Sequence, residues 1–296
     1  MTSSQDALRH EVASVNGIRM HYVTEGEGDL VVMLHGFPEF WYSWRHQIPA
    51  LAARFRVVAP DQRGYNLTEK PRGVSSYRMG TLVEDIVDLI RVLGYERAVV
   101  VGHDWGGAVA WQLAITHPEV VRRLIVLNIP HPMAMARGLL TPRQLLRSWY
   151  IFYFQMPGLP ELSLRANNYA AIEQSFRGMA IRKTAFSDED IAAYKEAVAR
   201  PGALTAAINW YRAALRNPEL LARRQAPAVQ APTLMIWGEN DTALGKELTY
   251  GTDRWVRDFR VHYIPNCSHW VQQEQPELVN RLMLDFLAGL PADRRR

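Results

Sequence analysis

The sequence predicts an α/β fold in which helices cover both faces of a mostly parallel central sheet. Short apolar runs typical of strands alternate with longer helical patterns from residue 18 to residue 129. The same alternation returns between residues 233 and 290, whereas residues 131–229 carry helical patterns and no convincing strand. Strands that alternate with helices form parallel sheets, and right-handed crossovers place the helices on both faces.

Seven runs are predicted as strands, and several are apolar enough to be buried on both faces. In chain order they are 18–24, 30–35, 55–61, 97–104, 123–129, 233–241 and 260–266. Helices are predicted at 43–54, 81–95, 106–117 and 276–290. Pro49 indicates a break or kink in the first of them. The second has one apolar stripe and a natural stop at Gly94.

The change of pattern near residue 131 predicts a helical insertion within a single α/β core. We expect residues 1–130 and 230–296 to form the core domain and residues 131–229 to form a helical cap. The insertion is rich in aromatic residues, Arg and Ala.

The composition is that of an ordinary soluble globular protein, with 48% hydrophobic and 22% charged residues among 296. The net charge of +4 includes the basic residues Arg294–Arg296. The sequence has no basic stripe interleaved with aromatic residues, so we expect no nucleic-acid partner. With one cysteine, no signal-peptide pattern and no apolar run of membrane-spanning length, we expect a cytoplasmic protein without a membrane partner. A homodimer is compatible with the sequence.

Asp104 stands in a Gly-bounded turn, GHDWGG (102–107), between a predicted buried strand and a predicted helix. This is the setting of a nucleophile elbow, although Ser is usual at that position and an Asp also caps helices. A carboxylate is already ionised at neutral pH and needs no base before it attacks. An Asp that attacks saturated carbon leaves an ester, which water can hydrolyse. The residue therefore predicts displacement at sp3 carbon followed by ester hydrolysis.

The second step needs a base and an orienting acid, and two residues follow the nucleophile in the chain order of such triads. Asp241 follows the strand TLMIWGEN, and His269 follows the last predicted strand. Both lie at carboxyl ends of strands, where α/β sheets place their sites. Glu239 is the alternative acid, and Asn128 occupies the other position at which this fold can carry one.

The loop after the strand LVVML begins His35-Gly36-Phe37-Pro38 and supplies half of an oxyanion hole. We expect the backbone N–H groups of Phe37 and Trp105 to be its donors. His35 is expected to brace the loop, and His103 to be a packing residue. The sequence shows no residues at the spacing of metal ligands, so we expect no metal site, and the chemistry requires no organic cofactor.

With these residues in view, the chain resembles the α/β-hydrolase-fold epoxide hydrolases over nearly its whole length. The motifs that carry the resemblance are HGFPEFWYSWR (35–45), DQRGYN (61–66), GHDWGG (102–107), SWYIFYFQMPGLPE (148–161), NWYR (209–212), GENDTAL (238–244) and NCSHW (266–270). The resemblance implies a helical cap after the sixth strand of the sheet. It also implies Asp104 as nucleophile, with His269 and Asp241 activating water.

The same resemblance implies two cap tyrosines that hold and protonate the epoxide oxygen. Tyr211 in NWYR is the clearer, and Tyr150 matches the first better than its competitor Tyr153. The expected substrate is a small apolar epoxide, which reacts with water. Beside the catalytic groups, we expect the pocket to be lined by Phe37, Pro38, Trp105, Tyr153 and Trp270.

Haloalkane dehalogenases share the fold and the Asp nucleophile, so the leaving group has to separate the two activities. A halide leaves as a stable anion, whereas an opened epoxide leaves as a basic alkoxide that needs a proton, which tyrosine can supply. Phe37 stands where a dehalogenase often has an Asn as second halide donor. A third hypothesis is a ligand sensor that uses the hydrolase fold without turnover. The complete triad opposes it, although a fold can be retained while its chemistry is lost.

Overall fold

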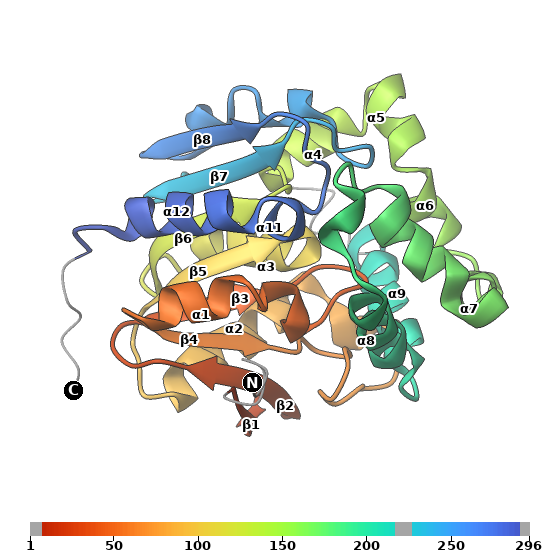
Figure 1. The fold of residues 1–296 in the computed structure, drawn as a ribbon, viewed down its shortest axis with the longest axis horizontal. Coiled ribbons are helices and arrows are strands. Elements are labelled where there is room, and N and C mark those ends of the chain that lie inside the picture. The colour runs from red at the N-terminus through yellow and green to blue at the C-terminus, as the bar shows by residue number, and fades with distance from the viewer. Residues whose placement is uncertain (1–7, 217–226, 291–296) are drawn as a thin grey trace.

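The computed structural model describes residues 8–216 and 227–290, so the basic end Arg294–Arg296 lies outside the described residues. Eight strands form one sheet in the order β1-β2-β4-β3-β5-β6-β7-β8. The pairs β1–β2 and β2–β4 are antiparallel, and every other neighbouring pair is parallel. The predicted α/β-hydrolase fold is confirmed, and Figure 1 shows the sheet between two layers of helices.

The seven predicted strands are present, most of them shifted by a residue or two. Their bounds are β2 Ile18–Glu25, β3 Leu30–Leu34, β4 Arg56–Pro60, β5 Ala98–His103, β6 Val121–Leu127, β7 Thr233–Gly238 and β8 Phe259–Ile264. The strand that the sequence did not reveal is β1, Arg9–Val15, an edge strand in which only Ala13 and Val15 are buried. With so few apolar positions it carries no strand signal of its own.

Helices pack on both faces of the sheet. On one face lie α2, Met79–Val92, and α3, Asp104–Thr116, and on the other lie α1, Gln47–Ala52, and α12, Pro276–Leu287. The expected break at Pro49 is wrong in position, because Pro49 lies inside the first turn of α1. A proline is tolerated there since its missing N–H would have no partner within the helix. The break comes earlier, after a 3-10 helix at Trp41–Trp44.

Between β6 and β7 the described residues form helices and no strand of the sheet. They are α4 Pro132–Gly138, α5 Pro142–Arg147, α6 Trp149–Tyr153, α7 Leu159–Glu173, α8 Asp188–Ala199 and α9 Ala203–Leu215. In Figure 1 α5 to α9 lie together at one end of the sheet, away from α1 and α12. Helix α7 is interrupted at 166–169, where three consecutive residues have positive φ.

The order of the strands locates the site. Strand β3 lies between β4 and β5, so the chain order reverses beside it. Ligands of open α/β sheets bind beyond the carboxyl ends of strands at such a switch point. The loop after β3 contains Phe37, and the turn after β5 contains Asp104, which places these two residues side by side.

Candidate active site

Asp104 is the first residue of α3 and has a φ of 48°, a left-handed conformation that non-glycine residues rarely adopt. The turn is tight because a Cβ on Gly106 would overlap the backbone carbonyl groups of Leu34 and His35. Backbone strain of this kind persists where the surrounding structure fixes it, and it projects the Asp104 side chain from the strand end.

The Asp104 carboxylate has two different surroundings. Its Oδ1 atom accepts a hydrogen bond of 2.9 Å from the Phe37 backbone N–H, and its Oδ2 atom lies 3.6 Å from Nε2 of His269. Burial opposes ionisation, but the hydrogen bond and charge of His269 outweigh it, so the pKa of Asp104 lies below its ordinary value. The side chain is therefore an anion at neutral pH.

His269 lies between two carboxylates. Its Nδ1–H donates to Oδ2 of Asp241 at 2.7 Å, and its other ring nitrogen faces Asp104. Burial disfavours the imidazolium, but the two negative charges outweigh that effect and raise the pKa of His269 to about 10. The structure thus brings together the three residues expected as nucleophile, acid and base.

Asp241 is held by three further donors. The backbone N–H groups of Ala243 and Leu244 donate to Oδ1 at 2.8 and 2.9 Å, and Nδ2 of Asn128 donates to Oδ2 at 2.8 Å. Asn128 also accepts from the Gly238 N–H at 2.9 Å, which ties the ends of β6 and β7 together. The sequence showed only that Asn128 is not an acid, and its function as a donor to Asp241 was missed. Glu239, the alternative acid, pairs with Lys246.

The loop after β3 supplies the expected backbone donor, the Phe37 N–H, which bonds to Asp104. The function of the Trp105 N–H as the second oxyanion donor stays a prediction. Pro38, the next residue in the chain, is buried. His35 braces this loop, since its Nδ1 donates to the Gly36 carbonyl at 2.9 Å and its Nε2 accepts from the Gln62 N–H at 3.1 Å. With one nitrogen a donor and the other an acceptor, the ring is neutral, in agreement with a pKa lowered by burial.

Behind the nucleophile lies a buried pair that the sequence did not reveal. Nδ1 of His103 is 2.8 Å from Oε2 of Glu39, and its Nε2–H donates to the His269 carbonyl at 2.9 Å. Glu39 is 1% exposed and also accepts from the Gly36 N–H, Ser43 and Gln272. Burial raises its pKa, but the charge and hydrogen bond of His103 bring that pKa below the ordinary value. The pair connects the loops that carry Asp104 and His269.

Tyr150 and Tyr211 come from α6 and α9 and lie next to each other, with ring centroids 5.9 Å apart. The Tyr211 ring packs edge-on against Phe37 at 5.3 Å and Trp105 at 4.9 Å, of which the first donates its N–H to Asp104 and the second follows it in the chain. Removal from water and the charge of Asp104 raise the pKa of both phenols. Both hydroxyl groups therefore stay protonated near the nucleophile.

Tyr153 has different partners from Tyr150. Its hydroxyl donates to Oγ of Ser163 at 2.6 Å on α7. The ends of α6 and α9 are joined by Arg212, which is buried and bonds to the carbonyls of Phe154 and Met156 at 3.0 and 2.7 Å. A 2.7 Å ion pair connects Arg212 with Glu161 on α7. These contacts hold Tyr150 and Tyr211 at a fixed separation.

Trp270, expected to line the pocket, lies in another aromatic cluster. Its ring packs edge-on against His269 at 4.9 Å and is tilted against Phe176 at 4.7 Å, and its indole N–H donates to the Ser175 carbonyl at 2.9 Å. It is 2% exposed. Trp270 thus supports the back of His269, and its function in substrate binding stays a prediction that these contacts do not favour.

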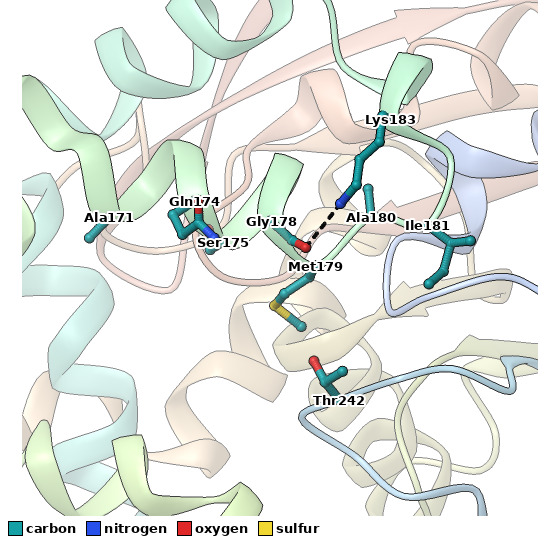
Figure 2. A pocket seen from close by; sticks show the side chains of 9 residues that line it. All are labelled: Ala171, Gln174, Ser175, Gly178, Met179, Ala180, Ile181, Lys183 and Thr242. Atoms are coloured by element: carbon teal, nitrogen blue, oxygen red, sulfur yellow. Dashed lines mark hydrogen bonds between the residues drawn. The ribbon is translucent and has the colours of Figure 1, made fainter.

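A cavity of about 600 Å³ lies between the inserted helices and the loop after β7. Figure 2 shows Met179 and Thr242 pointing toward each other across it, with Lys183 donating to the Gly178 carbonyl. Thr242 follows Asp241 directly, so the cavity adjoins the acid of the triad. Its lining includes neither Asp104 nor the two tyrosines.

Within 8–216 and 227–290, no cluster of ligating side chains could hold a metal ion, and no helix is long and apolar enough to cross a membrane.

Comparison with known proteins agrees with this architecture. Residues 29–276 match the family model of the alpha/beta hydrolase fold. The chain is 47% identical to the AB hydrolase superfamily protein YfhM of Bacillus subtilis, over 95% of this chain and 99% of that protein. It is 41% identical to Epoxide hydrolase 2 of Caenorhabditis elegans, over 94% and 79% respectively. A solved structure of an epoxide hydrolase from Bacillus megaterium has a TM-score of 0.88 and 34% identity, over 94% and 99%.

Proposed function

The chain belongs to the epoxide hydrolases of the α/β-hydrolase fold, and from that premise we propose that it converts an apolar epoxide to a vicinal diol through an ester on Asp104. The observation that carries the proposal is the position of Tyr150 and Tyr211. Their ring centroids are 5.9 Å apart, and burial together with the charge of Asp104 raises the pKa of both hydroxyls. An epoxide oxygen held by both hydroxyl groups presents a ring carbon to the nucleophile.

In the first step Oδ2 of Asp104 attacks a ring carbon, the carbon–oxygen bond breaks, and a tyrosine proton passes to the leaving oxygen. The charge of Asp104 helps to raise the tyrosine pKa values in the free enzyme. Ester formation removes that charge. The tyrosines therefore become stronger acids as the leaving oxygen becomes a base, which favours proton transfer at the time it is required.

In the second step the tyrosinate first takes a proton from the His269 imidazolium. Water then attacks the ester carbonyl, the neutral imidazole takes the proton from that water, and a proton returns to Oδ2 as the diol leaves. The two oxygens of Asp104 have separate functions in this proposal. Oδ1 already accepts from the Phe37 N–H and becomes the oxyanion, while Oδ2 leaves with the diol. Once Asp104 is an ester, one of the two charges that raise the pKa of His269 has gone, and the imidazole can act as a base.

The helices between β6 and β7 act as a cap in this proposal, with residues 131–229 as the cap domain and 1–130 and 230–296 as the core. Helices α6 and α9 supply both proton donors, whereas the loops of the sheet supply Asp104, Asp241 and His269. Closing the cap over the sheet excludes bulk water, which strengthens the hydrogen bonds to the epoxide oxygen.

Halide release by the same nucleophile is the second candidate, and Phe37 opposes it. A dehalogenase needs side-chain N–H donors for the halide, but the Phe37 side chain has none. The Trp105 ring packs edge-on against the Tyr211 ring, with centroids 4.9 Å apart. A panel of aryl epoxides and haloalkanes, assayed for diol and halide, separates the two activities.

A single turnover in oxygen-18 water tests the covalent route. The first diol should carry unlabelled oxygen derived from Asp104, and the label should appear in the peptide that contains Asp104. Asp104→Ala should form no diol. Label in the diol of the first turnover would mean direct attack by water and would end the proposal.

A further inference from the structure

The outer side of the helices between β6 and β7 exposes a concentration of large apolar side chains. Fourteen large hydrophobic residues are exposed among the described residues, and eight of them fall between residues 140 and 162. We call these eight the cap-edge surface: Leu140, Leu145, Leu146, Trp149, Phe152, Met156, Leu159 and Leu162. Contiguous exposed apolar patches on soluble proteins mark interaction sites.

The residues are arranged as one surface. Leu145, Trp149, Phe152, Met156 and Leu159 follow each other at intervals of three or four residues through α5, α6, the turn after α6 and the first residue of α7. Helices α5, α6 and the start of α7 succeed one another along one edge of the molecule (Figure 1). No neighbouring helix covers that edge in the described structure.

The other side of α6 belongs to the proposed active site. Tyr150 contacts Tyr211, and Phe154 is 5% exposed against the same ring. The short helix Trp149–Tyr153 thus separates the reacting groups from solvent by its own thickness. A molecule that covers the cap-edge surface is therefore separated from Tyr150 and Tyr211 by α6 alone.

The charges around this surface are positive. Residues 132–165 contain four arginines, Arg137, Arg143, Arg147 and Arg165, and a single acid. That acid, Glu161, is buried in its ion pair with Arg212. Two of the arginines, Arg143 and Arg147, share one acid, Glu247, at 3.3 and 3.8 Å. The rim therefore keeps an excess of guanidinium groups.

We propose that the cap-edge surface binds the face of an anionic lipid bilayer. Exposed Trp, Phe and Leu side chains enter the boundary between headgroups and acyl chains, and arginines at the rim bind lipid phosphates. A second copy of the chain fits less well, since a two-fold interface brings the arginines of one copy toward those of the other. The helices lie on the bilayer and do not span it, so the proposal departs from the sequence expectation of no membrane partner, which was based on the lack of a membrane-spanning run.

The docked orientation has a consequence that rests on the proposed function. An apolar epoxide partitions into the acyl region, so a cap that rests on the bilayer receives its substrate from the phase in which the substrate is concentrated. Tyr150, on the inner side of α6, then lies one helix away from the lipid. Turnover of an epoxide dissolved in anionic vesicles should exceed turnover in neutral vesicles at equal substrate content.

Flotation with vesicles tests docking without any turnover. The full chain should float with vesicles of equal phosphatidylglycerol and phosphatidylcholine, should stay below with phosphatidylcholine alone, and should be released as salt rises. Leu146→Ser combined with Leu162→Ser should lower the partition coefficient by about tenfold or more. Arg143→Gln combined with Arg165→Gln should lower it by about fivefold per arginine.

Val12→Ser combined with Val92→Ser is the matched control, because both valines are more than half exposed but lie on β1 and α2. It should bind vesicles as the wild type does.

Brominated lipids should quench tryptophan fluorescence, and Trp149→Phe should remove most of that quenching. Absence of flotation with anionic vesicles overturns the proposal. A wild-type dimer in analytical sedimentation that is lost only in the Leu146/Leu162 variant also overturns it, because the surface would then bind a second copy of the chain. Vesicle binding without diol formation would refute the proposed function and leave docking intact.

Discussion

Nε2 of His269 lies 3.6 Å from Oδ2 of Asp104, while the opposite carboxylate oxygen of Asp104 is held by the Phe37 N–H at 2.9 Å. One side of the carboxylate thus faces the proposed base, and the other side faces the oxyanion donor. This arrangement separates attack from hydrolysis within one side chain. Substitution of the base and substitution of the proton donors should therefore affect different steps of the reaction.

His269→Gln should stop the reaction at the ester. The variant keeps Asp104 and both tyrosines, so one equivalent of epoxide should react and remain bound. Steady-state turnover should fall by a factor of about 10² to 10⁴, the usual contribution of a general base. Intact-protein mass spectrometry should show the added mass of one substrate, which Asp104→Ala should lack. A His269→Gln enzyme with normal turnover and no adduct would assign the base elsewhere.

Tyr150→Phe and Tyr211→Phe should each slow ester formation without abolishing it, because the partner hydroxyl remains. The double variant should lose a factor of about 10² to 10⁴ in that step. Tyr153→Phe is the matched control, since its hydroxyl bonds to Ser163 and not to Tyr211. Rapid-quench measurement of the first turnover gives the rates. If Tyr153→Phe slows the step as much as Tyr150→Phe, the first proton donor has been assigned to the wrong residue.

Glu39→Gln should destabilise the fold. Glu39 is buried, faces His103 at 2.8 Å and accepts from three other groups, so the amide leaves a buried imidazole and several donors without a carboxylate. Breaking a buried ion pair on one side costs about 3–5 kcal/mol. Urea denaturation measures the loss, and Glu277→Gln, at an exposed glutamate on α12, should change stability by less than about 0.5 kcal/mol. Equal stability of the two variants would show that the pair contributes nothing.

Stability should decline on the alkaline side through His269. Its pKa is raised from 6.5 to about 10 in the folded protein, so folding favours the protonated ring. The resulting stabilisation is complete below pH 6.5 and is lost as pH rises toward 10, with a slope of at most about 1.4 kcal/mol per pH unit. The difference in unfolding free energy between wild type and His269→Gln should therefore shrink across this interval. A difference independent of pH would contradict the raised pKa.

The fold and the reacting residues of the core were predictable because their signals are local. Buried strands are continuous apolar runs, and Asp104 stands in a Gly-bounded turn whose steric limits require small neighbours. Strand β1 was not predictable, because an exposed edge strand needs few apolar residues. Pro49 misled because the rule against proline in helices does not hold in the first turn.

Contacts between distant segments were beyond the sequence. Glu39 and His103 are 64 residues apart, and nothing in either motif indicates that they pair. Asn128 was visible only as a position without an acid, although its side chain donates to Asp241. The position of Trp270 behind His269 likewise follows from packing with Phe176, a residue of the inserted helices. The motifs identify residue types, while the folded chain decides which surfaces those residues meet.

The proposed proton donors and the nucleophile are encoded in separable stretches of the gene. Tyr150 and Tyr211 lie on helices between β6 and β7, whereas Asp104, Asp241 and His269 lie in turns of the sheet. Exchange of the intervening segment in a chimera would therefore change which leaving group is accepted and keep the capacity to form an ester. New substrate classes can arise on such a scaffold by replacement of one contiguous insert, without simultaneous mutations in the triad.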